Sequence, residues 1–556
     1  MKKITTVFFI FISLICKAQH DYPKAQHLST YFLGAQRCGD TDSWIHGACH
    51  LKDGLQIGKD LTGGWHDCGD YIKFHHTGPF TALMYLYGFE NFTDAYADNY
   101  SQYKSAPPSN GIPDILDEVK IETDYLIRCI NNGIIYWQIG DAKDHNSFSE
   151  PVTQSNESAA NGGGIRPVLS TTSGHSNALG NAASALALMS IIYSPYDNAY
   201  ATTCLNAGKE YYKIATTNPE GTADPDNFYG GPGGLATKKH EDELGLAAAI
   251  LFRATNDNSY LVSAEIYSNT TTNLWDEFYY GNVHPLLQVE LYKLTQKKIY
   301  LDNIALKVNN YSLSTCGYYH STNWGSLPFA GNAAFLAALY HKLSGNINAY
   351  NFAKSNINFI LGSHGYISKD APDNFSFLIG YNELGGSYPK HPHHSAAFGK
   401  KLNAWTIYNN EKNNPGSETY LHELKGGLAG GPESECDNFT DNIDNYISSE
   451  YCSYYGAGFM GGLAAVNSIE NNLTANSTDE IDLRISISYL SGSKARINLN
   501  SSTTLYVYSI TGKCVMKSPK SFEHILDFKG LKCGVYFIKD LKSKKVFKYL
   551  NRQQDF

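Results

Sequence analysis

The chain contains 556 residues, of which only 17% are charged, compared with about a quarter in an average soluble domain. Its 53 acidic and 44 basic side chains give a net charge of −9, and this balance argues against a nucleic-acid partner, which would favour a basic surface. Aromatic residues reach 13%, with 41 tyrosines, and tyrosine suits both a packed interior and a surface that binds flat polar ligands. The length suits one large domain together with a smaller one.

Residues 1–18 have the pattern of a secretory signal peptide. Lys2 and Lys3 precede a mostly apolar run from Thr5 to Cys16, and Ala18 supplies a small residue before a cleavage point. The apolar run is too short to cross a bilayer comfortably. We therefore expect a secreted, extracellular protein, and no later stretch predicts a membrane span.

The pattern of residues 19–475 predicts a large all-α domain. In the segment 112–130, apolar residues recur at helical spacing behind Pro113, which is a helix start signal. Further segments are rich in alanine and apolar on more than one side, which indicates helices that are covered by other helices. Long loops rich in Gly, Asn and Ser separate these segments, and loops of that length often carry function.

Residues 476–556 follow a polar linker and have a different character. Short segments with alternating apolar residues are separated by Gly and Ser, which predicts a small β-sandwich domain. The aromatic residues of these segments, such as Tyr506 and Tyr508, are expected in its core.

Removal of the signal peptide leaves ten cysteines. No two of them form a C-x-x-C motif, so a zinc or redox site has little support from the sequence. An exported protein can form disulfides. The pairs Cys436 with Cys452 and Cys514 with Cys533 are candidates, and buried free thiols are the alternative.

The stretch DLTGGWHDCGD, residues 60–70, places Asp67 and Asp70 three positions apart behind a glycine pair. Two carboxylates that lie close together divide their proton affinities, so one of them can stay ionised as a general base. Trp65 offers a flat face on which a sugar ring could stack. The alternative is structural, with Asp67 capping a turn and Asp70 capping a helix through Tyr71–Phe74.

A second acid-rich stretch, residues 430–459, combines carboxylates with glycines and aromatic residues. Its acids are Asp437, Asp441, Asp444 and Glu450. Glycoside hydrolysis needs one protonated acid for the leaving oxygen and one ionised carboxylate on the opposite face. Asp70 and Glu450 can supply that pair if the fold brings the two stretches together.

Five segments resemble motifs of glycoside hydrolase family 9, whose members are mostly endoglucanases. DLTGGWHDCGDYIKF is similar to D-x-x-G-G-[WY]-x-D-A-G-D-x-x-K-F, and NGIPDILDEVKIETDYL is similar to the helix that follows it. STNWGSLPFAGNAAF resembles W-G-S-L-R-[YF], and YPKHPHHSAA resembles P-x-x-x-H-H-R. FTDNIDNYISSEYCSYYGAGF resembles F-x-D-x-R-x-x-Y-x-x-x-E-x-x-x-x-Y-N-A-G-F. The segments keep the family's order and span most of residues 22–470.

The resemblance implies an (α/α)6 barrel and an inverting mechanism. It assigns Asp70 as the general base that activates water, Asp67 as a group that helps to hold this water, and Glu450 as the general acid. Asp441 and His393 are implied to line the cleft near the cleavage point. The implied sugar contacts are Trp65, His66, Trp324 and Tyr446. An inverting pair needs room for water, so its carboxyl groups should lie roughly 6.5–9.5 Å apart.

Three arginines of the family pattern are replaced in this chain. Ser395, Ile443 and Pro328 occupy their positions, and Gly456 replaces an asparagine. Arginine makes forked, charge-assisted contacts to ligand oxygens and carboxylates. Their joint loss predicts a changed subsite or a rebuilt carboxylate network, while the catalytic acids are retained.

No metal is expected at the catalytic site. His391, His393 and His394 lack the i, i+4 spacing of a helical zinc site. No cofactor is required by this interpretation, although some family members carry structural calcium in oxygen-rich loops. The loop with Asp224 and Asp226 could hold calcium, and a plain turn is the alternative.

The C-terminal residues resemble a type A sorting domain of the type IX secretion system of Bacteroidetes. The resemblance rests on LYVYSITGKCVMKS, LDFKGLKCGVYFIKD and the basic final strand KKVFKYL. It implies the secretion machinery as a partner and attachment at the cell surface as one destination. The alternative is a carbohydrate-binding module.

These observations predict a secreted, inverting endoglucanase that cleaves β-1,4-glucosidic bonds in cellulose-like or mixed-linkage β-glucans. One alternative is an exo-acting relative that cuts short β-linked oligosaccharides. The other is a catalytically weak glycan-binding protein, which the replaced arginines would favour. No nucleic acid is expected as a partner.

Overall fold

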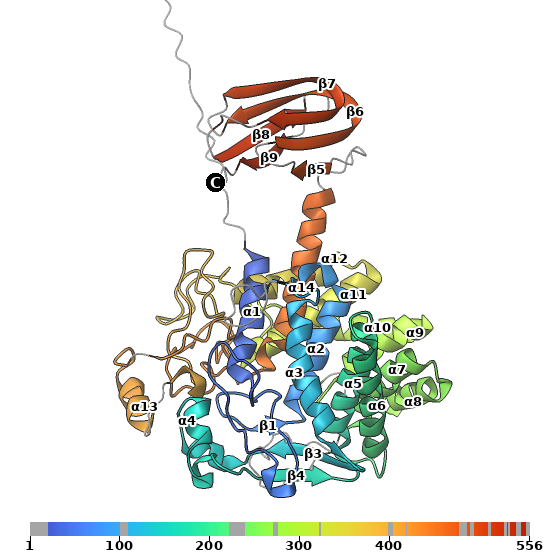
Figure 1. Ribbon diagram of the computed structural model, residues 1–556, viewed down its shortest axis with the longest axis vertical. Helices are drawn as coiled ribbons and strands as arrows, with labels where there is room; N and C mark the ends of the chain where they lie inside the picture. Colours follow the sequence, from blue (N-terminus) through green and yellow to red (C-terminus); the bar gives the residue numbers. More distant parts are fainter. Residues whose placement is uncertain are drawn as a thin grey trace, which may run out of the picture. The chain divides into compact units, whose positions relative to one another are not determined.

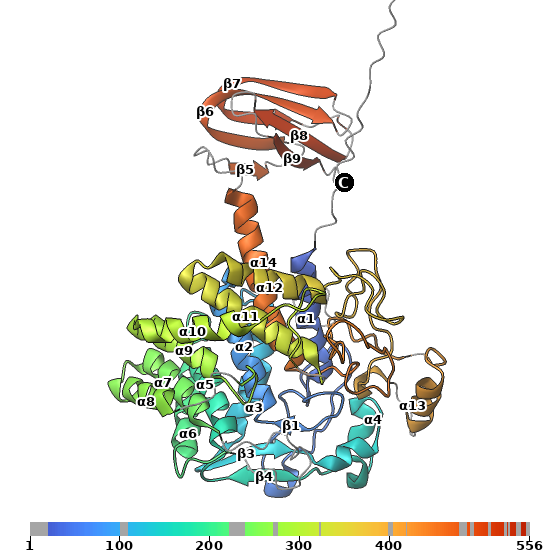
Figure 2. The ribbon, with the colours of Figure 1, turned by 180° about the vertical axis from the view of Figure 1, so that it is seen from behind.

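The structure is a computed structural model, shown in Figures 1 and 2. It describes residues 20–99, 109–221, 239–270, 276–321, 324–398, 404–418, 420–476, 486–489, 494–509, 513–527, 531, 534–540 and 546–551. The chain divides into two compact units, residues 1–468 and 469–556. The predicted signal peptide and the loop with Asp224 and Asp226 lie outside the described residues.

The first unit is mostly helical, as predicted. Its helices are α1 Tyr22–Gln36, α2 Thr77–Asn91, α3 Asp114–Arg128, α4 Pro151–Ser155, α5 Ser176–Tyr193, α6 Asn198–Ala215, α7 Glu241–Thr255, α8 Asn258–Thr270, α9 His284–Thr295, α10 Lys298–Asn310, α11 Ser326–Ser344, α12 Ile347–Ile360, α13 Ala404–Asn413 and α14 Tyr455–Asn476. The helix expected at residues 112–130 is α3, and Pro113 is its N-cap.

An inner ring of helices forms the core of this unit. Helix α2 packs on α5, α5 on α7, α7 on α9 and α9 on α11. Helix α14 closes the ring, since its backbone lies close to both α11 and α2. A Cβ atom added to Gly331 of α11 would lie only 2.7 Å from the backbone of Phe459, and one added to Gly88 of α2 would lie 3.2 Å from Gly461. Glycine therefore permits close helix contact at both closures.

Outer helices cover this ring, with α3 on α2, α6 on α5, α8 on α7, α10 on α9 and α12 on α11. The inner helices are buried almost all round, whereas outer helices such as α8 expose most of their residues. This burial explains the alanine-rich, doubly apolar segments of the sequence. The arrangement is a helical barrel of the kind predicted for residues 19–475.

A small antiparallel sheet lies at one end of the helical unit (Figures 1 and 2). Its strands are β1 Lys73–Phe74, β2 Ile130–Asn131, β3 Ile134–Ile139 and β4 Val168–Thr171. Strand β3 pairs with β4 on one side, and with β1 and β2 on the other. The sequence analysis predicted only helices here, although the β-branched and aromatic composition of β3 is typical of a strand.

The second unit contains β5 Ser486–Tyr489, β6 Lys494–Ser509, β7 Cys514–Asp527, β8 Gly534–Asp540 and β9 Val546–Asn551. These strands form one antiparallel sheet. Strand β7 pairs with one edge of β6. On the other edge, β5 pairs with the first part of β6 and β8 pairs with its last part. The described strands thus belong to a single hydrogen-bonded sheet, and a sandwich remains a prediction. Leu505 and Val507 are buried, whereas Tyr506 and Tyr508 are only half-buried, so the prediction that these tyrosines form the core is wrong.

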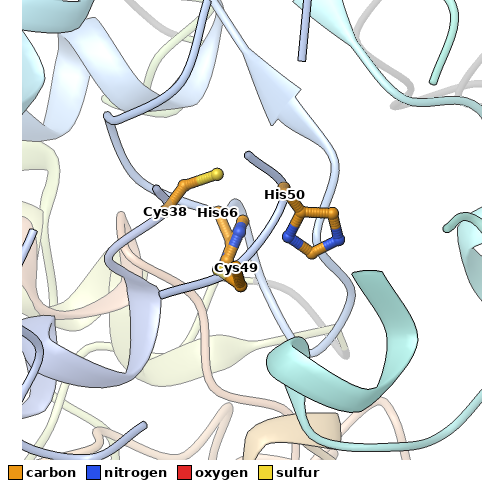
Figure 3. A group of neighbouring side chains, drawn as sticks. All are labelled: Cys38, Cys49, His50 and His66. Carbon is orange, nitrogen blue, oxygen red and sulfur yellow. The ribbon is translucent and has the colours of Figure 1, made fainter. Parts of the chain in front are cut away.

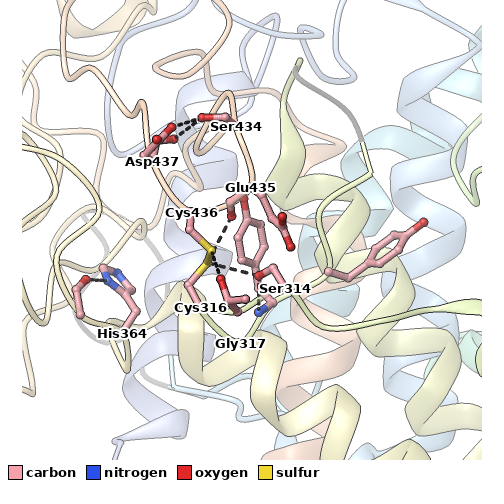
Figure 4. The surroundings of a disulfide bond; sticks show 12 residues. Ser314, Cys316, Gly317, His364, Ser434, Glu435, Cys436 and Asp437 are labelled. Carbon is pink, nitrogen blue, oxygen red and sulfur yellow. Dashed lines mark hydrogen bonds between the residues drawn. A yellow bond between two sulfur atoms is a disulfide. The ribbon is translucent and has the colours of Figure 1, made fainter.

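Two disulfides join distant parts of the first unit. Cys68 is bonded to Cys452, and Cys316 is bonded to Cys436 (Figure 4). The predicted pair Cys436–Cys452 is therefore wrong, because each of these cysteines has another partner. Cys514 is a free thiol, while Cys533 lies outside the described residues. None of the described helices combines the length and the apolar character that crossing a membrane would need.

Candidate active site

A cavity of about 1030 Å³ opens in the first unit and is lined by segments that lie far apart in the sequence. We call this cavity the cleft. The predicted site residues on its wall are Asp67, Asp70, Trp324, His393, Tyr446 and Glu450. The fold thus brings the early aspartates and the late glutamate to one surface, as their proposed chemistry requires.

The loop with the two aspartates turns sharply behind its glycine pair. Gly63 and Gly64 have φ angles of +87° and +75°, which favour glycine because other residues are strained there. A Cβ atom on Gly64 would also lie 2.6 Å from the ring of Tyr125. These glycines therefore let the loop pass close to α3 before it reaches the cleft.

A buried ionic network supports the same loop. The Asp53 carboxylate accepts from the Arg166 guanidinium at 2.7 and 2.9 Å, and it pairs with Lys73 at 2.9 Å. The Lys73 ammonium also donates to the carbonyls of Leu61 and Gly63. Because Arg166 donates to the Tyr71 carbonyl as well, the network holds both ends of the segment that contains Asp67 and Asp70.

Backbone hydrogen bonds join three segments at the floor of the cleft. The Ser453 N–H donates to the Asp67 carbonyl at 2.8 Å, and the Ser395 N–H donates to the Gly69 carbonyl at 2.9 Å. The His393 N–H donates to the Ser449 carbonyl at 2.7 Å. The two aspartates, His393 and Glu450 therefore lie on neighbouring chain segments that are joined by backbone hydrogen bonds.

The two carboxylate oxygens of Asp70 have different neighbours. Oδ1 accepts from the Ile72 N–H at 2.8 Å, and Oδ2 lies 3.5 Å from Nε2 of His145. Tyr71–Phe74 does not form the helix of the structural alternative, since Lys73–Phe74 is strand β1. Asp70 thus fixes a turn with one oxygen, while its side chain also lines the cleft.

The surroundings of Asp67 and Glu450 raise the pKa of both carboxyl groups and so favour their protonated forms. Burial raises the pKa of Asp67 to about 8, with a further contribution from the Asp70 charge, although the Thr77 hydroxyl donates to this carboxyl. Burial also raises the pKa of Glu450 well above its usual value, and the charges of Asp70 and Asp67 act in the same direction. A site with a protonated acid beside other carboxylates can perform general acid–base chemistry.

His393 is fixed in orientation by a backbone contact. Its Nδ1 donates to the Ile443 carbonyl, and burial lowers the pKa of His393 despite this hydrogen bond. The ring lies beside Phe148 and Tyr446, with centroid distances of 5.4 and 6.0 Å. A neutral His393 that donates through Nδ1 presents Nε2 as an acceptor.

Aromatic rings form the mouth of the cleft. Trp324 and Tyr446 are 50% and 49% exposed, and their ring centroids lie 5.3 Å apart. Such exposed flat rings suit stacking on a sugar. The sequence analysis did not single out the further aromatic residues on this wall, which are Phe148, Tyr279, Tyr280, Phe329, Trp405, Tyr408, Tyr454 and Tyr455. Tyr455 occupies the last tyrosine position of the motif that contains Glu450 and could have been found from it, whereas most of the others stand outside the quoted motif positions.

A second group of chemistry-bearing residues lies apart from the cleft wall. Cys38, Cys49, His50 and His66 are buried, and their ligand atoms all lie within 4.8 Å of one another (Figure 3). Within the described part of the chain, no nitrogen or oxygen atom is a hydrogen-bond partner of the ring nitrogens of His50 and His66, and both rings interact with the Cys38 thiol. Two thiols and two imidazoles are the donor set of a tetrahedral zinc site, so these residues fit such an ion.

The sequence analysis did not identify this group: it expected no metal at the catalytic site and considered only structural calcium elsewhere. The absence of a C-x-x-C motif gave a zinc site little support, but a loop can also bring ligands together from other spacings. The adjacent Cys49 and His50, flanked by Cys38 and His66, were the available signal.

A family model described as Glycosyl hydrolase family 9 matches residues 22–463. The chain belongs to glycosyl hydrolase family 9. It is therefore a glycoside hydrolase, as the sequence motifs predicted.

Relatives within this family agree with the assignment. Endoglucanase A of Bacillus pumilus is 29% identical over 482 residues, which cover 80% of this chain and 66% of that protein, so the match spans about two thirds of the relative's length. Endoglucanase 24 of Oryza sativa subsp. japonica is 27% identical, with coverages of 82% and 89%.

Solved structures show the same fold. The cellulase Cel9M of C. cellulolyticum, crystallised in complex with cellobiose, has a TM-score of 0.68 and 30% identity, and the match covers 81% of this chain and 99% of that one. The endoglucanase of the termite Nasutitermes takasagoensis has the same TM-score and coverages, with 29% identity.

Two predicted sugar contacts of this glycosyl hydrolase do not lie on the cleft. Trp65 is 2% exposed and packs edge-on against Tyr85, and its backbone N–H donates to the Glu122 carboxylate at 2.9 Å. His66 is completely buried in the group of Figure 3. Both follow the glycine pair, where the chain turns inward before Asp67, so the Trp65 side chain contributes to packing and the His66 side chain to the buried group with Cys38, Cys49 and His50.

Asp441 also lies away from the cleft wall, contrary to its predicted place near the cleavage point. Its carboxylate accepts from the backbone N–H groups of Lys390 and His391, at 2.6 and 3.0 Å. It lines a separate hollow of about 330 Å³. Asp441 therefore shapes the turn before His393 and does not face the cleft.

The replaced arginines leave a cleft wall of different chemistry. Pro328 and Ser395 line the cleft, whereas Ile443 is fully buried. Among the described residues, no arginine lines the cleft. Among the described lining residues, the candidates for contacts to sugar hydroxyls are neutral and acidic groups, aromatic rings and Lys239.

Proposed function

We propose that the chain is an inverting endo-β-1,4-glucanase that acts on cellulose-like or mixed-linkage glucans. The observation that carries this proposal is the shared cleft of Asp70 and Glu450, in which the pKa of Glu450 is raised by burial and by the neighbouring carboxylates. The endoglucanase names of its relatives and the cellobiose complex of Cel9M support the substrate class.

In this mechanism, protonated Glu450 donates its proton to the glycosidic oxygen. The Asp70 carboxylate takes a proton from a water molecule, whose oxygen attacks the anomeric carbon from the opposite face. The bond to the leaving chain breaks as the new C–O bond forms, so the configuration inverts. Protonated Asp67 lies beside Asp70 and helps to hold the water, and His393, Trp324 and Tyr446 hold the sugar.

A panel of β-glucans tests this proposal. Carboxymethylcellulose should lose viscosity quickly while little reducing sugar appears, since endo cleavage shortens long chains before it releases small products. Early release of small sugars with little loss of viscosity would favour the exo-acting alternative. Binding of the glucan without any hydrolysis would favour the glycan-binding alternative, which the cleft without arginine motivates.

The pH dependence of kcat/KM should report the pKa of the general acid, Glu450. Glu450 acts only when protonated, and its pKa is raised, so activity persists well above pH 4.5 and falls as the pH rises through the raised value. Initial rates on a soluble cello-oligosaccharide, measured between pH 4 and 10, give this alkaline limb of the pH profile, where activity falls. An alkaline limb at the ordinary glutamate value would contradict the assignment of Glu450.

We also infer that Cys38, Cys49, His50 and His66 hold a structural zinc ion. When bound, this ion would cross-link the loop that leads to Asp67. The purified protein should contain about one zinc per chain by elemental analysis, and chelation should lower Tm by about 5 °C or more. A His50→Ala variant should lose both the zinc and the response to chelator, while Cys204→Ser should keep both. A metal-free protein whose Tm is indifferent to zinc would overturn this inference.

Export is proposed on sequence grounds. The signal peptide pattern of residues 1–18 and the resemblance of residues 476–556 to a type A sorting domain support a secreted or cell-surface enzyme that uses type IX secretion machinery. Loss of export after deletion of residues 476–556 would support this role. Structural calcium at Asp224 and Asp226 stays a prediction.

A further inference from the structure

We propose that the disulfide Cys68–Cys452 is a positioning element of the active site, which holds the segment of Asp67 and Asp70 at working distance from Glu450. This inference rests on the acid and base roles proposed above, and it adds two positioning residues to the reaction.

The bond connects the two catalytic segments directly. Cys68 lies between Asp67 and Asp70, and Cys452 follows Glu450 by two positions. The bonded cysteines are 384 residues apart in the sequence. The motif that resembles this stretch has alanine where Cys68 stands, so the link is a feature of this chain rather than of the motif.

The sulfur atoms also lie against the acid. One ligand atom from each of Cys68, Cys452 and Glu450 falls within 4.8 Å of the other two. Both cysteines are buried and pack with Tyr455 and Tyr454, and Cys68 contributes to the cleft wall. The disulfide therefore acts in two ways, as a covalent link and as part of an apolar wall behind the Glu450 carboxyl.

A precise link matters because an inverting site must keep its two carboxyl groups at a spacing that admits one water molecule. Small displacements of reacting groups reduce rates steeply, by about a hundredfold for a misplacement of about 1 Å. The hydrogen bond from Ser453 to Asp67 also joins these segments. The disulfide adds a connection that thermal motion of the backbone does not break.

The second disulfide provides a matched control. Cys316–Cys436 joins the segment after α10 to the loop before Phe439, and neither cysteine lines the cleft (Figure 4). Both disulfides cross-link long loops, so removing either should lower thermal stability through a less constrained unfolded state. Only removal of Cys68–Cys452 should alter the chemistry.

The test compares Cys68→Ala/Cys452→Ala with Cys316→Ala/Cys436→Ala and wild type on a soluble cello-oligosaccharide. We expect the first variant to lose about tenfold or more in kcat with KM changed less than about twofold. Its alkaline limb should move to lower pH, because water replaces sulfur beside Glu450. The control variant should keep kcat and the pH profile within about twofold of wild type.

The outcomes separate this inference from the proposed function. If wild type releases no sugar from any glucan, the proposed function fails. If wild type and both variants share one kcat and one pH profile, the enzyme assignment stands and the positioning role is overturned. Equal losses of kcat in both variants would also overturn it, since they would reflect stability alone.

A second measurement does not depend on the folding of a variant. Active wild-type enzyme is denatured in iodoacetamide without reductant, digested and mapped by mass spectrometry. The proposal expects the peptides of Cys68 and Cys452 to be linked in the active fraction. Alkylated thiols at both positions in fully active enzyme would overturn the proposal.

Discussion

Glu450→Gln is expected to reduce kcat on cello-oligosaccharides by about a thousandfold, within the range of about 10² to 10⁴ for a general acid, which corresponds to about 4 kcal/mol of transition-state stabilisation. The amide has nearly the shape of the acid but cannot donate a proton of the required acidity to the leaving oxygen. Because burial, together with the charges of Asp70 and Asp67, raises the pKa of Glu450, this side chain is suited to the acid role.

Steady-state kinetics with purified protein measure this effect. KM should change little, because Glu450 acts mainly in the transition state. Glu435→Gln is the matched control, since Glu435 is an exposed glutamate of the same segment and does not line the cleft. Full activity of Glu450→Gln would remove Glu450 from the chemistry.

Asp70→Asn is expected to reduce kcat by a similar factor, on the order of 10² to 10⁴, because the amide cannot accept the proton of the attacking water. The turn at Ile72 should persist, since the amide oxygen can still accept from the backbone N–H that bonds Oδ1. The loss should therefore fall on kcat and kcat/KM rather than on folding.

This variant also has a second expected effect. The Asp70 charge contributes to the raised pKa of both Glu450 and Asp67, so its removal should lower both pKa values. The alkaline limb of the residual activity should accordingly move to lower pH. Asp40→Asn, at an exposed position, is the control. An unchanged rate would show that another group activates the water.

The helical unit could be predicted because its sequence repeats a simple physical pattern. Pro113 and the apolar spacing behind it marked α3, and the alanine-rich segments indicated buried inner helices. Strands β1 to β4 were missed because they are short and because β1 and β4 pair with β3 across long stretches of sequence. Local periodicity carries little information about such pairings.

Three of the four predicted acids line the cleft, whereas Asp441 lines a separate hollow and several neighbouring residues were predicted less well. Asp67, Asp70 and Glu450 line the cleft. Their motifs could be used to find them because the same residues, the glycine pair among them, set the backbone conformation that places these side chains. Trp65 and His66 belong to the same motif but face the interior, and sequence spacing alone does not determine which side of a loop a residue takes.

Connections between distant residues were outside the reach of sequence reasoning. Nothing in the spacing pairs Cys68 with Cys452 across 384 positions, since connectivity cannot be deduced from cysteine positions. The group of Cys38, Cys49, His50 and His66 likewise depends on how one loop folds back. Such contacts arise from the tertiary fold.

The central claim, attack by a water molecule that Asp70 activates while Glu450 protonates the leaving oxygen, is tested most directly by the configuration of the first product. Proton NMR of a cello-oligosaccharide digest, recorded before mutarotation, distinguishes the two anomers at the newly formed reducing end. The α-anomer should appear first, because one displacement inverts the β-linkage. Initial release of the β-anomer would show a covalent, retaining pathway and would contradict the account.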